Sequence, residues 1–284
     1  DRYQVGRVFL AGDAAHRHPP TTGLGLNTAI QDAHNLAWKL AAVLSGRAGR
    51  ALLDSYGPER QAIGMRNVDW AMFTALNHGV LDAGMGFSPV QTPEQRHANF
   101  EAFFADNPMG AARRARAAAV FATQRTEFQA HDLEIGFAYE HGALVPDGTP
   151  PPARDPLGAR HVPTTRPGHR LPHAWLEHAG TRCSTLDLAG ESSHFVLITG
   201  PDGDAWRAAA VAVFAASEVP LRIVTIGADG THGDVDGQWS KVSGIEQDGA
   251  VLVRPDNHVA WRSGGGAADP AAALTVALNC ILAR

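Results

Sequence analysis

The segment from Gly12 to Asn27, GDAAHRHPPTTGLGLN, holds the residues with the clearest chemical potential in this sequence. It follows an apolar run at residues 7–11, RVFLA, that predicts a short buried strand closed by Gly12 and Asp13. Open α/β sheets bind ligands at the carboxyl ends of their strands. A carboxylate at that place can accept hydrogen bonds from the hydroxyls of a sugar or polyol, which is the chemistry we expect of Asp13.

The second half of this segment is built for close approach of a flat ligand. Pro19 and Pro20 stiffen the loop, while Gly23 and Gly25 remove side chains that would hold a ligand away from the backbone. A helix is predicted to begin near Asn27, so its free N–H groups and positive dipole end face whatever lies over the preceding residues. Such donors suit the N1–C2=O edge of an isoalloxazine ring, where negative charge collects on reduction.

The helix that must position this loop is predicted over residues 27–45. Thr28 with Gln31 fits a capping box at its start, and Gly46 is placed to end it. The helical spacing of its apolar residues predicts one buried face, made of Ala29, Ile30, Ala33, Leu36, Ala37, Leu40, Ala41 and Leu44.

Further helices are predicted at residues 58–76 and 111–128. The stretch 146–172 holds eight prolines, which exclude a regular helix or an inner strand. We therefore expect a first domain over residues 1–145, a proline-rich linker, and a second domain over residues 173–284.

The second domain is predicted to be a small α/β unit. Its last two strands are joined by a tight turn at Pro255-Asp256-Asn257 and form a hairpin. The predicted strands cover residues 184–188, 195–199, 221–226, 250–254 and 258–262, and the predicted helices cover 204–217 and 270–283.

Composition excludes several classes of function. The formal net charge of −5 argues against nucleic acid or an anionic membrane as partner, and no apolar run is long enough to span a bilayer. Cys183 and Cys280 are isolated, which suits a reducing cytoplasm and gives no disulfide framework. His16, His18 and His34 lack a further ligand at zinc-like spacing, so no metal site is expected and the first two are interpreted as loop residues flanking a pocket.

The whole run of strand, GDAAH, PP, GLGLN and helix resembles the second FAD fingerprint of the para-hydroxybenzoate hydroxylase family of flavoprotein monooxygenases. The longer segment RHPPTTGLGLNTAIQDAHNLAWKLAAVLSG is most similar to the phenol and chlorophenol hydroxylase branch. The resemblance continues through HVPTTRPGHRLPHAWL, STLDLAG and VLVRPDNHVAWR, so it extends over most of the chain.

The resemblance implies an enzyme in which NAD(P)H reduces FAD and the reduced flavin activates O2 for transfer to a phenolic ring. It implies that Asp13 binds the ribityl chain and that the backbone of Gly25, Leu26 and Asn27 contacts the pyrimidine edge of the flavin. It assigns Pro20 the catalytic position, with its carbonyl facing the phenol. The implied cofactor-binding set is Gly12, Asp13, Pro19, Pro20, Gly23, Leu24, Gly25, Leu26 and Asn27.

The implied fold is α/β, with part of an FAD-binding monooxygenase domain followed by a thioredoxin-like domain. Because a CxxC pair is absent, that second domain is expected to serve packing or dimerisation, and a homodimer is expected. The family's first element, GxGxxG on a strand–turn–helix, is also absent. We therefore expect the carboxy-terminal part of a larger protein, inactive by itself without the amino-terminal region.

Two alternatives remain open at the level of sequence. One is an aromatic polyketide hydroxylase, which shares motif and fold with the phenol branch. The other is a non-catalytic dimerisation or interaction module, in which the second domain mediates association.

Overall fold

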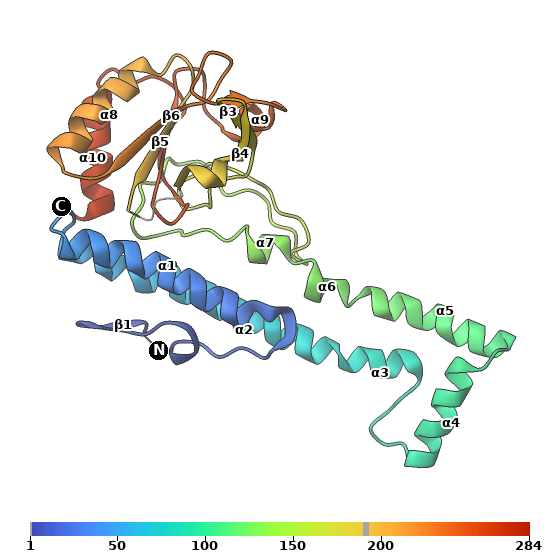
Figure 1. The fold of residues 1–284 in the computed structure, drawn as a ribbon. Helices are drawn as coiled ribbons and strands as arrows, with labels where there is room; N and C mark the ends of the chain where they lie inside the picture. The colour runs from blue at the N-terminus through green and yellow to red at the C-terminus, as the bar shows by residue number, and fades with distance from the viewer. Residues whose placement is uncertain (1, 190–192) are drawn as a thin grey trace.

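The computed structural model describes residues 2–189 and 193–284. Asp1 and Gly190, the last residue of the STLDLAG segment, lie outside these ranges. Two long neighbouring helices, α1 (Leu24–Leu44) and α2 (Tyr56–Asn77), form a central layer. A small amino-terminal hairpin lies on one side of this layer and the carboxy-terminal α/β unit lies on the other (Figure 1).

The amino-terminal hairpin pairs β1 (Gln4–Val5) with β2 (Val8–Phe9) in antiparallel register. The strand predicted over residues 7–11 is therefore shorter than expected. The prediction that it is buried is also wrong within the described residues, because the side chain of Val8 is 64% exposed.

The central helix α1 buries a polar face. Only Leu24 and Trp38 are apolar among its buried residues, which otherwise are Thr28, Asp32, Asn35 and Lys39. The apolar face predicted from spacing is half-buried or exposed in this chain, and Ile30 and Leu44 are 58% and 83% exposed. The prediction of a buried apolar face is thus wrong, because ion pairs with α2 draw the polar side of the helix inward.

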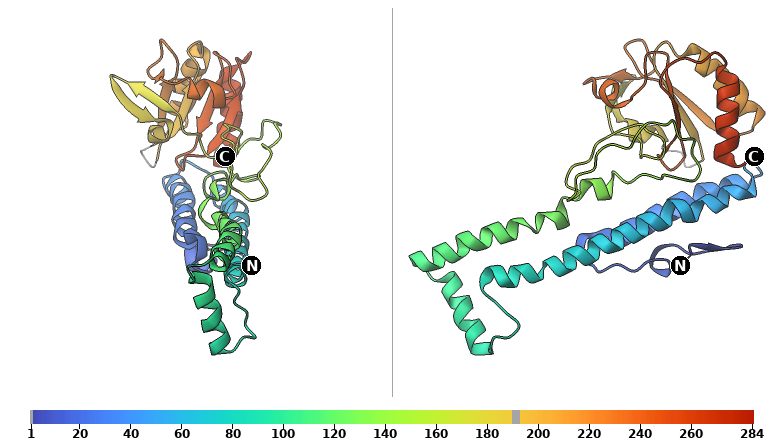
Figure 2. Two further views of the ribbon diagram at one scale, coloured as in Figure 1. Left: turned by 90° about the vertical axis from the view of Figure 1, so that its right-hand side faces the viewer. Right: turned by 180° about the vertical axis from the view of Figure 1, so that it is seen from behind.

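A helical arm projects away from the rest of the chain (Figure 2). Its helices are α3 (Gly79–Met85), α4 (Pro93–Phe104) and α5 (Pro108–Ala122), followed by the short α6 (Arg125–Phe128) and α7 (His131–Glu134). The helix predicted over 111–128 begins earlier and is divided in two. Asn107 sets its start by capping the backbone N–H of Gly110, with proline as the first helical residue.

The carboxy-terminal unit is built on a four-stranded sheet in the order β6-β5-β8-β9. Its order along the chain is strand–helix–strand and then strand–strand–helix, with β5 parallel to β6 and antiparallel to β8. This is a thioredoxin-like arrangement. The bounds are β5 Phe195–Thr199, α8 Asp204–Ala216, β6 Leu221–Thr225, β8 Ala250–Val253, β9 Val259–Ser263 and α10 Pro270–Leu282.

Alternation along the strands gives this sheet two apolar faces. Leu197 and Leu252 pack with α8 and α10, whereas Ile198 and Val251 face the opposite cluster around Leu176. Trp38 of α1 joins the first cluster, with its ring 5.9 Å from that of Phe195. The core of the carboxy-terminal unit therefore extends onto the central helix.

A second, smaller sheet has the order β4-β3-β7, made of β3 (Trp175–His178), β4 (Thr181–Ser184) and β7 (Gly233–Asp234). The short helix α9 (Gln238–Val242) follows β7. The strand predicted over 184–188 is wrong, since Thr185–Ala189 form a 3₁₀ helix. The carboxylate of Asp187 turns the chain there by accepting the backbone N–H of Ser184 at 2.7 Å.

The proline-rich stretch 146–172 forms no regular helix or strand, as predicted. Its end nevertheless docks on the carboxy-terminal unit. The N–H of Gly168 donates to the carbonyl of Val259 at 2.8 Å, and Arg170 pairs with His258 in an isolated antiparallel bridge.

Candidate functional site

The chain leaves the amino-terminal hairpin through a tight turn at Gly12–Ala14. Gly12 has a φ of +58°, and an added Cβ would lie 3.0 Å from the Cβ of Ala29 on α1. Glycine is therefore required at this position, both for the backbone conformation and for the close approach to the helix. Asp13 follows with an exposed side chain, which is free to meet a ligand.

The loop then reaches α1 through a strained 3₁₀ turn, Thr21–Gly23. Thr22 has a φ of +67°, an uncommon conformation for a β-branched residue that costs on the order of 1–2 kcal/mol. Two hydrogen bonds hold the turn in place. The Thr21 hydroxyl donates to the carbonyl of Ala71 on α2 at 2.8 Å, and the Thr22 N–H donates to Glu127 at 3.3 Å.

The amino terminus of α1 carries no side-chain cap. Gly23 occupies the N-cap position with a φ of +66°, and no side chain accepts from the first turn. The predicted capping box of Thr28 and Gln31 is wrong, because Thr28 lies inside the helix and donates to the carbonyl of Leu24. The first N–H groups of a long helix are thus left as donors for a ligand.

Asp32 is the buried hub that holds this loop against the helices. Its carboxylate accepts from the Gly12 N–H at 3.2 Å, from His16 Nε2 at 2.7 Å and from Arg60 Nε at 2.8 Å. The ring of His18 extends the network, with Nε2 2.9 Å from His16 Nδ1. Asp32 is not among the site residues predicted from the sequence.

The direction of the hydrogen bonds from His18 through His16 to Asp32 follows from the carboxylate of Asp32. An ionised carboxylate can only accept, so His16 donates through Nε2 and accepts through Nδ1 when its ring is neutral. His18 then donates through Nε2 to His16. Burial and the neighbouring His16 lower the pKa of His18, which favours this neutral arrangement.

A second buried cluster joins the central helices to the carboxy-terminal hairpin. Glu59 of α2 accepts from Lys39 at 2.8 Å and from both terminal nitrogens of Arg254 at 2.8 Å. Arg254 also pairs with Asp256 in the β8–β9 turn. Burial opposes the charge on Glu59, but Arg254 and Lys39 lower its pKa to about 2. Burial lowers the pKa of Lys39 to about 8.

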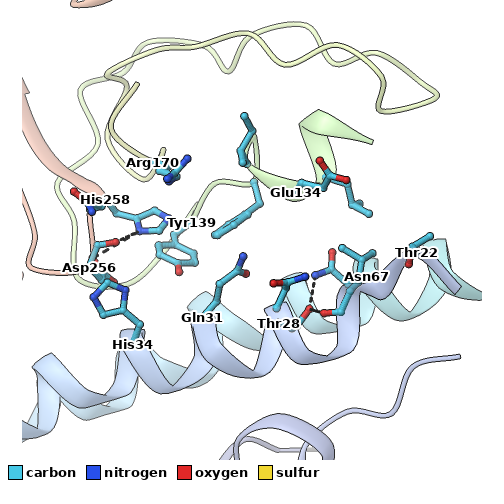
Figure 3. Close-up of a pocket in the computed structure, with 16 residues that line it drawn as sticks. Thr22, Thr28, Gln31, His34, Asn67, Glu134, Tyr139, Arg170, Asp256 and His258 are labelled. Atoms are coloured by element: carbon cyan, nitrogen blue, oxygen red, sulfur yellow. Dashed lines mark hydrogen bonds and ion pairs between the residues drawn. The ribbon is translucent and has the colours of Figure 1, made fainter. Parts of the chain in front are cut away.

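A cavity of about 460 Å³ lies on the side of α1 that faces the carboxy-terminal unit (Figure 3). Its lining residues come from α1, α2, the region of α7 and the β8–β9 turn. They are Thr22, Leu24, Asn27, Thr28, Gln31, His34, Asn67, Leu133, Glu134, Ile135, Phe137, Tyr139, Arg170, Asp256, Asn257 and His258.

The predicted site residues follow one another from the Gly12–Ala14 turn to the start of α1, and they differ in exposure. Leu24 is buried and lines the cavity together with Asn27, whereas Leu26 is 74% exposed. Pro20 is exposed at the turn, and Gly25 packs beside His18. The polar residues at positions 28, 32, 35 and 39 repeat with helical spacing, and this pattern could have revealed the buried network from sequence.

In the part of the chain that the structure describes, no group of three or more His, Cys, Asp or Glu side chains could hold a metal ion. Within the same residues, no helix is long and apolar enough to cross a membrane.

Two known protein families match this chain. Residues 1–71 match the family described as FAD binding domain, and residues 164–284 match the family described as aromatic-ring hydroxylase, C-terminal. The matched ranges contain the uncapped helix start and the whole thioredoxin-like unit, respectively.

Individual proteins are similar over nearly the whole chain. Phenol 2-monooxygenase of Pseudomonas sp. (strain EST1001) is 41% identical over 95% of this chain and 45% of its own length. Tetracenomycin A2 monooxygenase-dioxygenase of Streptomyces glaucescens is 41% identical over 99% of this chain and 42% of its own. The chain thus spans less than half the length of these curated relatives.

A solved structure supports the same likeness in three dimensions. The flavin-dependent monooxygenase PieE, in complex with FAD and substrate, superimposes with a TM-score of 0.88 at 44% identity. The match covers 99% of this chain and 48% of PieE.

Proposed function

This chain belongs to the family of FAD-dependent aromatic-ring hydroxylases, and we propose that it forms the flavin-facing wall of an enzyme that hydroxylates a phenolic ring. The enzyme would use FAD, with NAD(P)H and O2 as co-substrates. The observation that carries this proposal is the uncapped amino terminus of α1, which stands beside an exposed carboxylate at Asp13.

The residues present fit the flavin half of FAD. The exposed carboxylate of Asp13 suits the hydroxyls of the ribityl chain. The free N–H groups of Gly25 and Leu26, with the backbone of Asn27 next to them, suit the electron-rich pyrimidine edge, since the helix dipole favours negative charge there. Open space at Gly23 allows a flat ring to come near, whereas a Cβ added at Gly25 would be in van der Waals contact with His18 at 3.7 Å.

When bound, the flavin supplies the reducing electrons and the activation of oxygen, and the protein supplies position and electrostatics. Asp32 fixes the loop through Gly12 and His16, so the carboxylate of Asp13 and the helix start keep a constant spacing. Pro20, at the exposed turn, is the residue we assign to the junction of flavin and substrate, with its carbonyl toward the phenol. Gly12, Pro19 and Leu24 complete the wall as packing and backbone positions.

The test is Asp13→Ala in the protein that carries this chain. Loss of a charge-assisted hydrogen bond predicts FAD binding weaker by about ten-fold or more, measured by flavin retention and fluorescence titration. Asp69→Ala is the matched control, because Asp69 is another exposed aspartate, on α2. Equal FAD affinity in Asp13→Ala and in the control would refute the assigned wall.

Two kinds of ring remain as substrates within this proposal. The similarity to phenol 2-monooxygenase supports a small phenol, whereas the similarity to the tetracenomycin enzyme supports an aromatic polyketide. Turnover of simple phenols against polycyclic phenols, measured as NAD(P)H oxidation coupled to product, separates them.

We further propose that the protein acts in the cytoplasm as a homodimer. Both described cysteines, Cys183 and Cys280, are free thiols, which suits a reducing compartment. The other reading is a non-catalytic association module formed by the thioredoxin-like unit. A colourless protein that forms a stable oligomer but neither binds FAD nor oxidises NAD(P)H would favour the module over the enzyme.

A further inference from the structure

The cavity along α1 adjoins the flavin-facing wall, with Leu24 and Asn27 common to both, and continues along the helix beyond it. It opens between α1 and the carboxy-terminal unit, on the side of the helix away from the amino-terminal hairpin (Figure 3). Its lining extends from Leu24 to His34, which is roughly 15 Å along the helix axis at the usual rise. The wall proposed for the flavin ends at Asn27, so most of the cavity lies beyond it.

One wall of this cavity is aromatic and apolar. Tyr139 stacks on His258 with ring centroids 4.3 Å apart, and Phe137 lies 5.4 Å from the same imidazole. Leu24 and Leu133 also line the cavity and are buried. A lining that combines aromatic rings with aliphatic side chains favours an aromatic ligand.

Arg170 brings an uncompensated positive charge to the same cavity. Its backbone is fixed beside the β8–β9 turn, because Arg170 and His258 form an antiparallel bridge. Across residues 2–189 and 193–284, no group makes a hydrogen bond or ion pair with its guanidinium. The side chain is half-buried, and burial lowers its pKa without an opposing anion.

The other buried arginines of the region differ from Arg170 in this respect. Arg254 pairs with Glu59 and Asp256, and Arg60 pairs with Asp32. A half-buried guanidinium without an anion is costly unless a ligand supplies one.

The carboxylates that line the cavity are already engaged. Asp256 is paired with Arg254 inside the turn, and Glu134 lies 3.2 Å from His131. Two amide oxygens on the walls, those of Asn67 and Asn257, are buried and accept no hydrogen bond from residues 2–189 or 193–284. Among these residues, the cavity therefore offers the guanidinium of Arg170 together with acceptors that a hydroxyl could satisfy.

We propose that this cavity binds a flat aromatic molecule with one anionic group, an aromatic carboxylate or a phenolate, whose anion pairs with Arg170 and whose ring lies against Tyr139 and Phe137. The site is additional to the flavin and its substrate. It lies where the helical part meets the thioredoxin-like unit, so its occupant contacts both.

Calorimetric titration of the FAD-saturated protein with benzoate tests the proposal. Benzoate is expected to bind, and Arg170→Gln is expected to weaken it at least about ten-fold through loss of the charge-assisted pair. The neutral isostere benzamide should bind weakly and lose little in the variant. Arg116→Gln, at an exposed arginine on α5, is the matched control and should bind benzoate normally.

A cavity-filling variant, Ile135→Trp, gives a second test that keeps Arg170. Ile135 lines the cavity with a side chain 39% exposed, so a larger ring can be placed there without filling the core. Benzoate binding should be lost while the circular dichroism spectrum is retained.

The outcomes separate this site from the flavin and substrate sites. Equal benzoate affinity in Arg170→Gln and Arg116→Gln overturns the proposal, as does competition of benzoate with FAD or with the phenolic substrate. Asp13→Ala should leave Arg170-dependent benzoate binding intact even where flavin binding fails, so failure of the flavin assignment is recognised independently.

Discussion

The central helical layer and the thioredoxin-like unit hold themselves together by opposite means. Most side chains buried on α1 and α2 are charged or polar, among them Asp32, Lys39, Glu59 and Arg60. In the sheet of the carboxy-terminal unit most buried side chains are Val, Leu, Ile or Ala, and they form apolar clusters on both faces. The two regions meet at Arg254, whose guanidinium enters the polar layer from the apolar sheet.

This difference shows that the polar layer fixes the positions of its side chains more narrowly than apolar packing does in the sheet. Apolar packing tolerates small shifts, whereas a carboxylate that accepts from three directions fixes its partners within hydrogen-bond distance. Asp32 does this for the loop at Gly12 and His16, next to the helix start assigned to the flavin. The polar layer therefore holds the loop of the candidate site in place, and the apolar sheet packs behind this layer.

The largest expected effect on stability comes from removing the charge of Glu59, which joins the two regions. Glu59→Gln leaves Arg254 and Lys39 buried with reduced compensation, so we expect the free energy of unfolding to fall by about 3–5 kcal/mol. Denaturant unfolding measures this. Little or no loss would mean that the buried cluster contributes no more than exposed ion pairs do.

Acid titration gives the same carboxylate a second readout. Its pKa is lowered from the ordinary 4.5 to about 2, so its stabilising contribution is complete above about pH 4.5 and is lost as the pH falls toward 2. The Gln variant should lack this part of the pH dependence. An unchanged profile between pH 4.5 and 2 would contradict the assignment.

A somewhat smaller effect is expected in the apolar region. Leu252→Ala, at a fully buried position on β8, should cost about 2–5 kcal/mol in the free energy of unfolding, because it removes packing against α8 and α10. Unlike the loss from Glu59→Gln, this loss should not depend on pH between 4.5 and 2. A pH-dependent loss would show that the two regions are not distinct in the way described.

The smallest effect on stability is expected from a substitution on the apolar face of α1, which the spacing of its residues predicted to be buried. Ile30 is 58% exposed, so Ile30→Gln should change the stability of this chain by less than about 0.5 kcal/mol. Thermal unfolding of the 284-residue chain checks this. A loss of the size expected for Leu252→Ala would mean that the predicted apolar face is the buried one after all.

Local patterns identified much of the molecule in advance. The predicted strand over 195–199 has the same bounds in the structure, the hairpin at Pro255-Asp256-Asn257 is confirmed, and the helix predicted over 58–76 differs from α2 by a residue or two. These elements were accessible because their hydrophobic period and turn residues are local properties. The helix after the glycine-containing loop was likewise indicated, although α1 begins at Leu24, three residues before the predicted start at Asn27, and its cap was misassigned.

What the sequence by itself determined is the family and the loop on which the proposed flavin chemistry rests, because GDAAH, PP and GLGLN are contiguous and each residue type has a local meaning. Only the tertiary structure decided which face of α1 is buried, because ion pairs between residues as far apart as Glu59 and Arg254 outweigh the apolar spacing of one helix. It also decided that Asp32 anchors the loop and that Arg170 lies beside Tyr139 and His258 with no partner among the residues that the structure describes. Those relations depend on contacts across the fold, and no local period or propensity encodes them.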